Sequence, residues 1–210
     1  MRIIKQLLLI TGLFVIAACG ATKENISRYY VIEIPDDFQI PGNAENPMLK
    51  GSCEIAPVEI YPAFASREIA NRSGSHEIIY YQFHHWAVAP GETLTLLLEN
   101  YMNRASVFNR ASTRFWKTKP GFKLETTIYQ LEVINEKDGL SAHLALEFKL
   151  FRNPEEILLI RHEADRMQKL QEQDLNLFAE TVGKLFHEEL NKLSRAISER
   201  LPDLKKTAKQ

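Results

Sequence analysis

The feature that most constrains the fold is a hairpin signature in the second half of the chain. Every second residue is apolar along Leu140–Leu150, the alternation of a strand with one buried face. The dipeptide Asp138-Gly139 precedes this segment, and Asp-Gly is a strong signal for a tight hairpin turn. Ile157–Ala164, after a turn at Arg152–Glu156, predicts a third strand of the same meander.

The strand before the turn carries a break in its pattern. Apolar residues alternate from Phe122 to Ile128, but the apolar parity then shifts to Leu131 and Val133. One extra residue in a strand produces such a shift, so a β-bulge is predicted near Tyr129.

The remaining elements are shorter strands and two amphipathic helices. Strands are predicted at 29–34, 52–60 with a break or an edge at Pro57, 67–71, 77–86 and 107–109. One helix opens at Pro90 with an apolar stripe from Leu94 to Ala105, and a longer one covers 174–201, with Pro202 just past its end. Packing on the domain's own sheet is favoured for the long helix over a coiled coil or a membrane helix. The order predicts an α/β (α+β) sandwich: a mixed, mostly antiparallel sheet with two main helices packed on one face.

The N-terminus carries a leader. Arg2 and Lys5 precede an apolar run over 7–16, which is shorter than the roughly 20 residues that cross a bilayer. Residues 15–18, Val-Ile-Ala-Ala, lie directly before Cys19 and resemble a bacterial lipobox. We therefore expect cleavage before Cys19 and acylation of its thiol; the alternative is an ordinary signal peptide that contains a cysteine.

These features divide the chain into four parts. Residues 1–18 are predicted to be the lipoprotein signal peptide, 19–28 a lipidated tether, 29–201 one globular domain and 202–210 a basic C-terminal tail. Gly20 follows the cysteine, whereas the inner-membrane retention rule of enteric bacteria requires an aspartate there. The expected location is the periplasmic face of the outer membrane, with the lipid anchor as the membrane contact.

Composition and residue spacing give no support to nucleic-acid binding or catalysis. The formal net charge is -1, which offers no electrostatic footprint for a nucleic acid. Cys53 is the only cysteine besides Cys19, so it has no partner within the chain and is expected to be a buried small apolar group.

The candidate chemical groups are scattered. His84 and His85 are neighbours on a predicted strand, so their side chains point to opposite faces, and the other four histidines stand apart. The chain has no Gly-x-Ser-x-Gly elbow. We therefore predict no catalytic residue, no metal site and no cofactor; a periplasmic hydrolase is the weakest alternative.

A binding function remains. Tyr80, Tyr81 and Trp86 belong to an aromatic strand that leads directly into the first helix, and aromatic residues are enriched at protein contacts. These three residues are the predicted partner-binding side chains. The competing interpretation is a central strand with core on both faces.

The order of motifs resembles the auxiliary lipoproteins of ABC-type transport systems. The resemblance rests on Tyr29-Tyr30 soon after the cysteine, the aliphatic strand 53–60, the tyrosine-rich strand 79–86 ending in Trp86, Ala89-Pro90, and the leucine-rich helix 94–102. It implies a non-enzymatic component of a lipid-transport apparatus that docks an MCE-domain tunnel protein at the outer membrane, as a homo-oligomeric ring. The alternative is an envelope assembly factor resembling the lipoprotein of lipopolysaccharide export.

Overall fold

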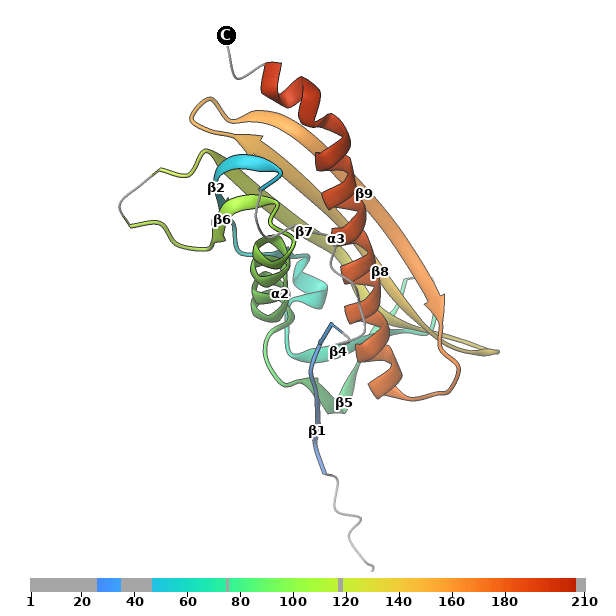
Figure 1. The fold of residues 1–210 in the computed structure, drawn as a ribbon. Helices are drawn as coiled ribbons and strands as arrows, with labels where there is room; N and C mark the ends of the chain where they lie inside the picture. The colour runs from blue at the N-terminus through green and yellow to red at the C-terminus, as the bar shows by residue number, and fades with distance from the viewer. Residues whose placement is uncertain (1–25, 35–46, 75, 117–118, 207–210) are drawn as a thin grey trace, which may run out of the picture.

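The computed structural model describes residues 26–34, 47–74, 76–116 and 119–206 (Figure 1). The leader, Cys19, most of the tether and most of the loop after Ile34 lie outside these residues. The strands are β1 (Arg28–Tyr30), β2 (Leu49–Ile55), β3 (Glu59–Ile60), β4 (Glu68–Arg72), β5 (Ile78–Trp86), β6 (Phe108–Ser112), β7 (Phe122–Glu136), β8 (Gly139–Arg152) and β9 (Ile157–Lys169). The helices are the 3-10 turn η1 (Pro62–Phe64), α2 (Pro90–Arg104) and α3 (Leu175–Lys206).

The predicted hairpin forms the long part of the sheet. β7 and β8 pair antiparallel from Glu136 opposite Gly139 to Phe122 opposite Arg152. The register shifts between Ile128 and Gln130, which confirms the bulge at Tyr129. β9 pairs antiparallel with β8 and continues to Lys169, beyond the predicted end at Ala164. Every second side chain of this extension is still partly buried, and Arg166 forms ion pairs with Glu188 and Glu189 of α3.

The short strands attach to this meander through mostly parallel pairings. β2, β3 and β4 each lie parallel to β7, β2 also lies parallel to β6, and β1 lies parallel to β5. β4 and β5 pair antiparallel. The chain breaks between β2 and β3 around Pro57, as predicted, since proline has no N–H to donate to a neighbouring strand. The first strand is shorter than predicted, and residues 31–34 follow it without a ladder partner.

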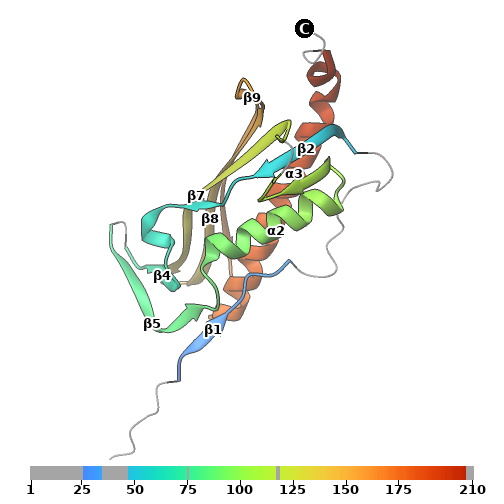
Figure 2. The same ribbon diagram turned by 90° about the vertical axis from the view of Figure 1, so that its left-hand side faces the viewer.

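Both helices cover the same face of the sheet (Figure 2). α2 lies against β6 and β2, and α3 lies against β8, β9 and β1. The two helices also meet each other: the Tyr101 hydroxyl donates to Asn191 Oδ1 at 2.7 Å, and its ring meets the edge of the His187 ring at 5.4 Å. The predicted α/β sandwich with its mixed sheet is confirmed.

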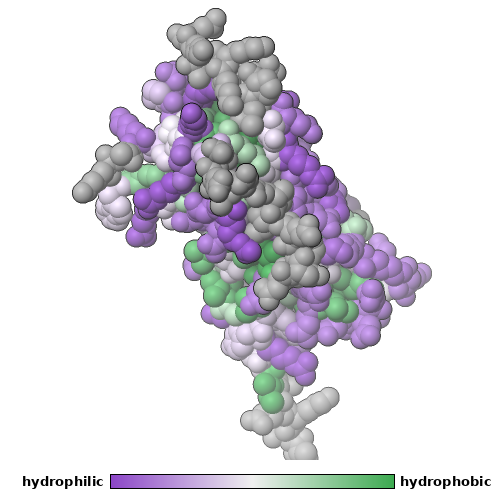
Figure 3. Space-filling view, in the orientation of Figure 1, coloured by the Kyte–Doolittle hydropathy of each residue, from purple (hydrophilic) through white to green (hydrophobic). Residues whose placement is uncertain are grey.

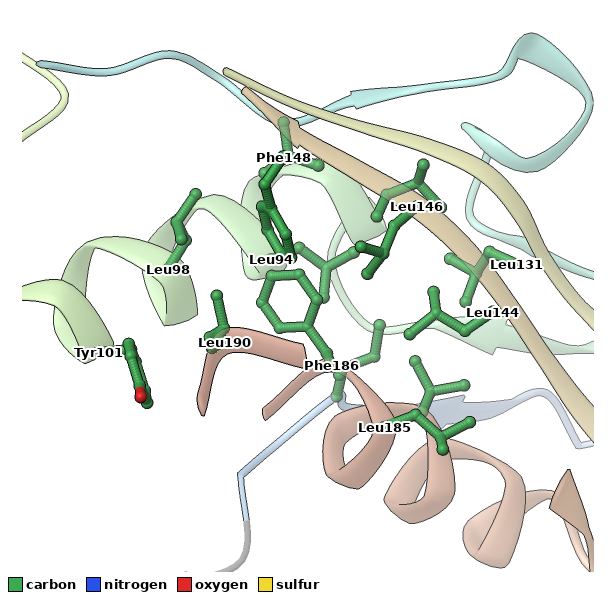
Figure 4. Close-up of a cluster of buried hydrophobic side chains, with 14 of the residues drawn as sticks. Leu94, Leu98, Tyr101, Leu131, Leu144, Leu146, Phe148, Leu185, Phe186 and Leu190 are labelled. Carbon is green, nitrogen blue, oxygen red and sulfur yellow. The ribbon is translucent and has the colours of Figure 1, made fainter. Parts of the chain in front are cut away.

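The core fills the space between the helices and the long hairpin (Figure 4). Leu94 of α2, Phe148 of β8 and Phe186 of α3 converge there, and all three are fully buried. The apolar residues that alternate along β8 face this space, which is why the sequence alternation is so regular. The Cys53 side chain is also fully buried, as predicted, and burial raises the pKa of its thiol.

The end of α3 differs from the expectation. The helix does not stop at Leu201 but continues through Pro202 to Lys206. A proline removes one backbone hydrogen bond and crowds the carbonyl four residues earlier, while the other hydrogen bonds of the helix can remain. The first part of the predicted tail is therefore helical.

A buried carboxylate, that of Glu189, joins α3 to the sheet. Glu189 is almost fully buried and accepts hydrogen bonds from His162 at 2.8 Å, from Lys192 at 2.7 Å and from Arg166. Burial alone would raise the pKa of this carboxyl group, but the three donors outweigh it and lower the pKa to about 2.

This arrangement predicts loss of stability in acid. A carboxylate with a lowered folded-state pKa stabilises the fold above its unfolded pKa, near 4.5, and loses that contribution as the pH falls toward 2. Between pH 7 and pH 3 we expect Glu189 to account for a loss of about 2 kcal/mol in the free energy of unfolding. Urea unfolding at both pH values should show this loss reduced in Glu189→Gln and unchanged in a variant of an exposed residue, Glu155→Gln; equal losses in all three proteins would contradict the assignment.

Candidate partner-binding surface

Tyr80, one of the three predicted partner-binding residues, lies on the exposed side of β5. Its side chain is 45% exposed, and its hydroxyl donates to the Ala63 carbonyl at 3.0 Å. This bond ties β5 to η1. Ile79 beside it is exposed as well. Tyr80 is therefore fixed in position while its ring stays accessible.

Tyr81 is only half accessible. Its side chain packs against the core, and its ring meets the His84 ring edge-on at 5.6 Å. Burial raises the pKa of its hydroxyl. His84 in turn lies 2.7 Å from the Tyr30 hydroxyl, and burial together with the nearby Arg28 charge lowers the pKa of its imidazole. Tyr81 thus links the surface of β5 to the packing of β1.

Trp86 does not reach the surface. It is 2% exposed, and its ring packs 5.6 Å from the Phe178 ring of α3. The partner contact at Trp86 stays a prediction, and the burial of its ring gives that prediction no support. The pairing of β5 with β4 shifts register between Tyr80 and His85, and beyond this shift the last side chain of β5 turns inward. The aromatic strand is therefore divided between surface and core.

The nearby surface contains an apolar hollow, which we call the α2 groove. It has a volume of about 480 Å³ and lies between the β2–β3 segment and the start of α2. The residues that line it are Pro57, Val58, Ile60, Ala65, Ala89, Gly91, Glu92, Thr95 and Leu96. Figure 3 shows apolar side chains gathered around the N-terminal end of α2 and the chain before it.

Local geometry holds the walls of the α2 groove together. The Val58 N–H donates to Thr95 Oγ1 at 2.8 Å, and that hydroxyl donates to the Gly91 carbonyl at 2.6 Å. A Cβ at position 91 would come within 3.0 Å of the Val58 carbonyl oxygen, so a glycine allows the close approach. The groove is a preformed feature of the fold.

Leu96 is an exposed residue of the α2 groove that was not among the predicted partner-binding side chains. It is 61% exposed at the edge of the α2 groove, while its neighbours Leu94 and Leu98 are fully buried. The sequence did contain a sign of this: Leu96 is apolar but lies outside the apolar face of its amphipathic helix, on the side where polar residues are expected. Tyr61 and Val88, next in sequence to groove residues Ile60 and Ala89, are exposed too.

The described residues give little basis for other chemistry. No group of three or more His, Cys, Asp or Glu side chains that could hold a metal ion occurs among them. His143 lies between Glu132 and Asp165, at 3.2 and 2.8 Å, as part of an ion-pair network on the outer face of the sheet. Within the same part of the chain, no helix has the length and apolar character needed to cross a membrane.

Comparison with known proteins decides the family. A family model described as the ABC-type transport auxiliary lipoprotein component matches residues 37–197. The chain belongs to this family. The match covers β2 to β9, the α2 groove and most of α3, and it confirms the resemblance in the sequence.

Solved structures show the same fold for this family member. A crystal structure of a DUF330 protein from Xanthomonas campestris aligns with a TM-score of 0.66 and 13% identity, over 87% of this chain and 100% of that one. A crystal structure of an uncharacterised protein aligns with a TM-score of 0.57 and 12% identity, over 83% and 99% of the two chains. Among curated proteins, none matches. As a lipoprotein component of a transport system, the chain belongs to the cell envelope.

Proposed function

We propose that the chain is a non-enzymatic, lipid-anchored component of an ABC transport system that docks an MCE-domain tunnel protein at the periplasmic face of the outer membrane. The observation that carries this proposal is the family match over most of the folded domain. An accessible aromatic residue and a preformed apolar groove suit protein docking, and the carried cargo is a lipid or lipophilic compound.

Anchoring depends on Cys19. Acyl chains stabilise membrane attachment by about 0.8 kcal/mol per buried methylene, so more than one chain gives a lasting anchor. We expect Cys19→Ser to fold normally but to move from the membrane fraction to the soluble periplasmic fraction. Fractionation with a carbonate wash measures this shift. A Cys53→Ser variant serves as the control for the other cysteine and should stay with the membrane; retention of Cys19→Ser on the membrane would sink the anchoring argument.

The proposed docking surface consists of the α2 groove together with Tyr80, which is tied to η1 beside the groove residue Ala65. Its occupant is an apolar segment of the tunnel protein, whose rim would meet several copies of this chain arranged as a ring. Exposed apolar side chains around a preformed hollow allow burial without reorganising the domain. Glu92 at the start of α2 supplies a polar edge.

A charge in the groove tests this docking. Leu96→Asp should leave the urea midpoint almost unchanged, because the residue is exposed, but it should reduce co-purification of the MCE protein from detergent at least tenfold. Leu158→Asp, at an equally apolar exposed position in β9, is the matched control and should retain the partner. Equal recovery with both variants would exclude the groove, and capture of an outer-membrane assembly protein by the wild-type chain would favour the envelope assembly function.

A further inference from the structure

A second apolar surface lies where the chain enters the domain. Ile26, Tyr29 and Val31 are 70%, 59% and 49% exposed. They precede or alternate with Tyr30 and Ile32, which are buried in the core. Tyr29 belongs to β1, Ile26 precedes the strand and Val31 follows it, so the three residues form a short apolar stretch in contact with water.

Basic groups surround the exposed tyrosine. The Arg67 guanidinium lies over the Tyr29 ring, 5.6 Å from its centre, and the His85 ring lies 5.7 Å away. Arg67 Nε donates to the Trp86 carbonyl at 2.9 Å, which fixes the arginine beside the ring. Arg28 is also exposed. Tyrosine and arginine side chains are suited to the headgroup region of a bilayer. There the tyrosine ring has both apolar and polar neighbours, and the guanidinium group can contact lipid phosphates.

The position of this surface relative to the anchor is restricted. Even fully extended, the chain between Cys19 and Ile26 spans at most about 25 Å. β1 lies at one end of the domain, whereas the turn between β8 and β9 lies near the C-terminal end of α3 at the opposite end (Figure 1). An acylated Cys19 therefore keeps the β1 end close to its membrane.

We propose that the surface formed by Ile26, Tyr29, Val31 and Arg67, which we call the β1 surface, rests on the phospholipid bilayer, with the Tyr29 ring at headgroup level. The inference depends on the proposed acylation of Cys19. It sets the orientation of the domain: the β8–β9 turn points away from the anchoring membrane. The α2 groove then lies on the flank of the domain.

The charges near the β1 surface indicate the type of lipid. Glu33 and Glu180 line a hollow that also includes Tyr29 and Val31, and the exposed Glu68 follows Arg67 in the sequence. The acidic groups offset the positive charge of the arginines near the β1 surface. A zwitterionic bilayer is therefore sufficient for the contact, which does not require anionic lipid. Salt should consequently change the contact little.

Depth-dependent fluorescence quenching tests the orientation. The full acylated chain, carrying Trp116→Phe to remove the exposed tryptophan, is reconstituted into phosphatidylethanolamine–phosphatidylglycerol vesicles with brominated acyl chains. Tyr29→Trp is introduced in one sample and Leu158→Trp in the other. We expect at least twofold stronger quenching of the Tyr29→Trp sample than of the Leu158→Trp sample, together with emission at shorter wavelength. Trp86 is buried in both samples and gives an equal background.

The outcomes separate the two proposals. Equal quenching in both samples, with the protein floating with the vesicles, would overturn the β1 surface as a membrane contact and leave anchoring intact. Emission at shorter wavelength without quenching would also overturn it, because a second protein copy would then cover the surface. Failure of the chain to float with the vesicles would overturn the acylation and, with it, this inference.

Discussion

Replacing Gly183 with alanine is expected to destabilise the domain by about 3 kcal/mol, although alanine normally strengthens a helix. A Cβ at position 183 would lie 1.9 Å from the Glu33 carbonyl oxygen and 3.0 Å from its carbon. The contact is with backbone, so no side-chain rotation can relieve it. The segment after β1 would have to leave α3, and Ile32, which is 2% exposed, would lose its packing.

Urea unfolding measures this effect, and Gly74→Ala is the control. A Cβ at Gly74 meets no atom within 4 Å, so that variant should unfold at nearly the wild-type midpoint. If Gly183→Ala were as stable as the wild type or more stable, the close crossing of the first segment over α3 would be wrong. The result also bears on the proposed orientation of the domain on the membrane, because this crossing fixes the start of the domain to α3.

Truncation of Phe186 to alanine should cost even more, about 3–5 kcal/mol in the free energy of unfolding. The ring is fully buried and lies 6.0 Å from the Phe148 ring, at the point where α3, α2 and β8 converge (Figure 4). Removing the ring leaves a cavity, because α2, α3 and the sheet cannot all move inward to fill the space.

Two further variants define this prediction. Phe186→Leu keeps most of the apolar volume and should lose clearly less stability than Phe186→Ala. Phe115→Ala, in the loop between β6 and β7, should change the midpoint little because the side chain is only partly buried. Unfolding midpoints in urea and by heat report all three, and a loss below 1 kcal/mol for Phe186→Ala would contradict the central position of this ring.

The long-range part of the fold could not be predicted from the sequence. The hairpin of β7 and β8 and the bulge at Tyr129 follow from alternation and a turn dipeptide, which are local signals. The parallel pairing of β4 with β7 joins segments about 60 residues apart, and no local pattern specifies that register. The continuation of α3 past Pro202 was missed because a proline predicts a helix end more often than a helix interior.

The candidate site, too, could be predicted from the sequence only in part. Tyr80 and Trp86 were both predicted as partner-binding residues from their aromatic strand, and only Tyr80 is exposed, since aromatic composition does not tell which face a side chain takes. The α2 groove combines the β2–β3 segment with the start of α2, and segments that meet only in the folded chain leave no common motif. Leu96 alone carried a readable mark, as an apolar residue on the polar side of a helix.

Site-specific photo-crosslinking from the α2 groove tests the docking function most directly. A photoreactive amino acid replaces Leu96 in one strain and Leu158 in another, in cells that carry the whole transport system. We expect a crosslink from position 96 to the MCE-domain tunnel protein that disappears when that protein is deleted, and no such crosslink from position 158. Crosslinks to the tunnel protein from neither position, in cells where it is present and the lipoprotein is anchored, would contradict docking through this surface.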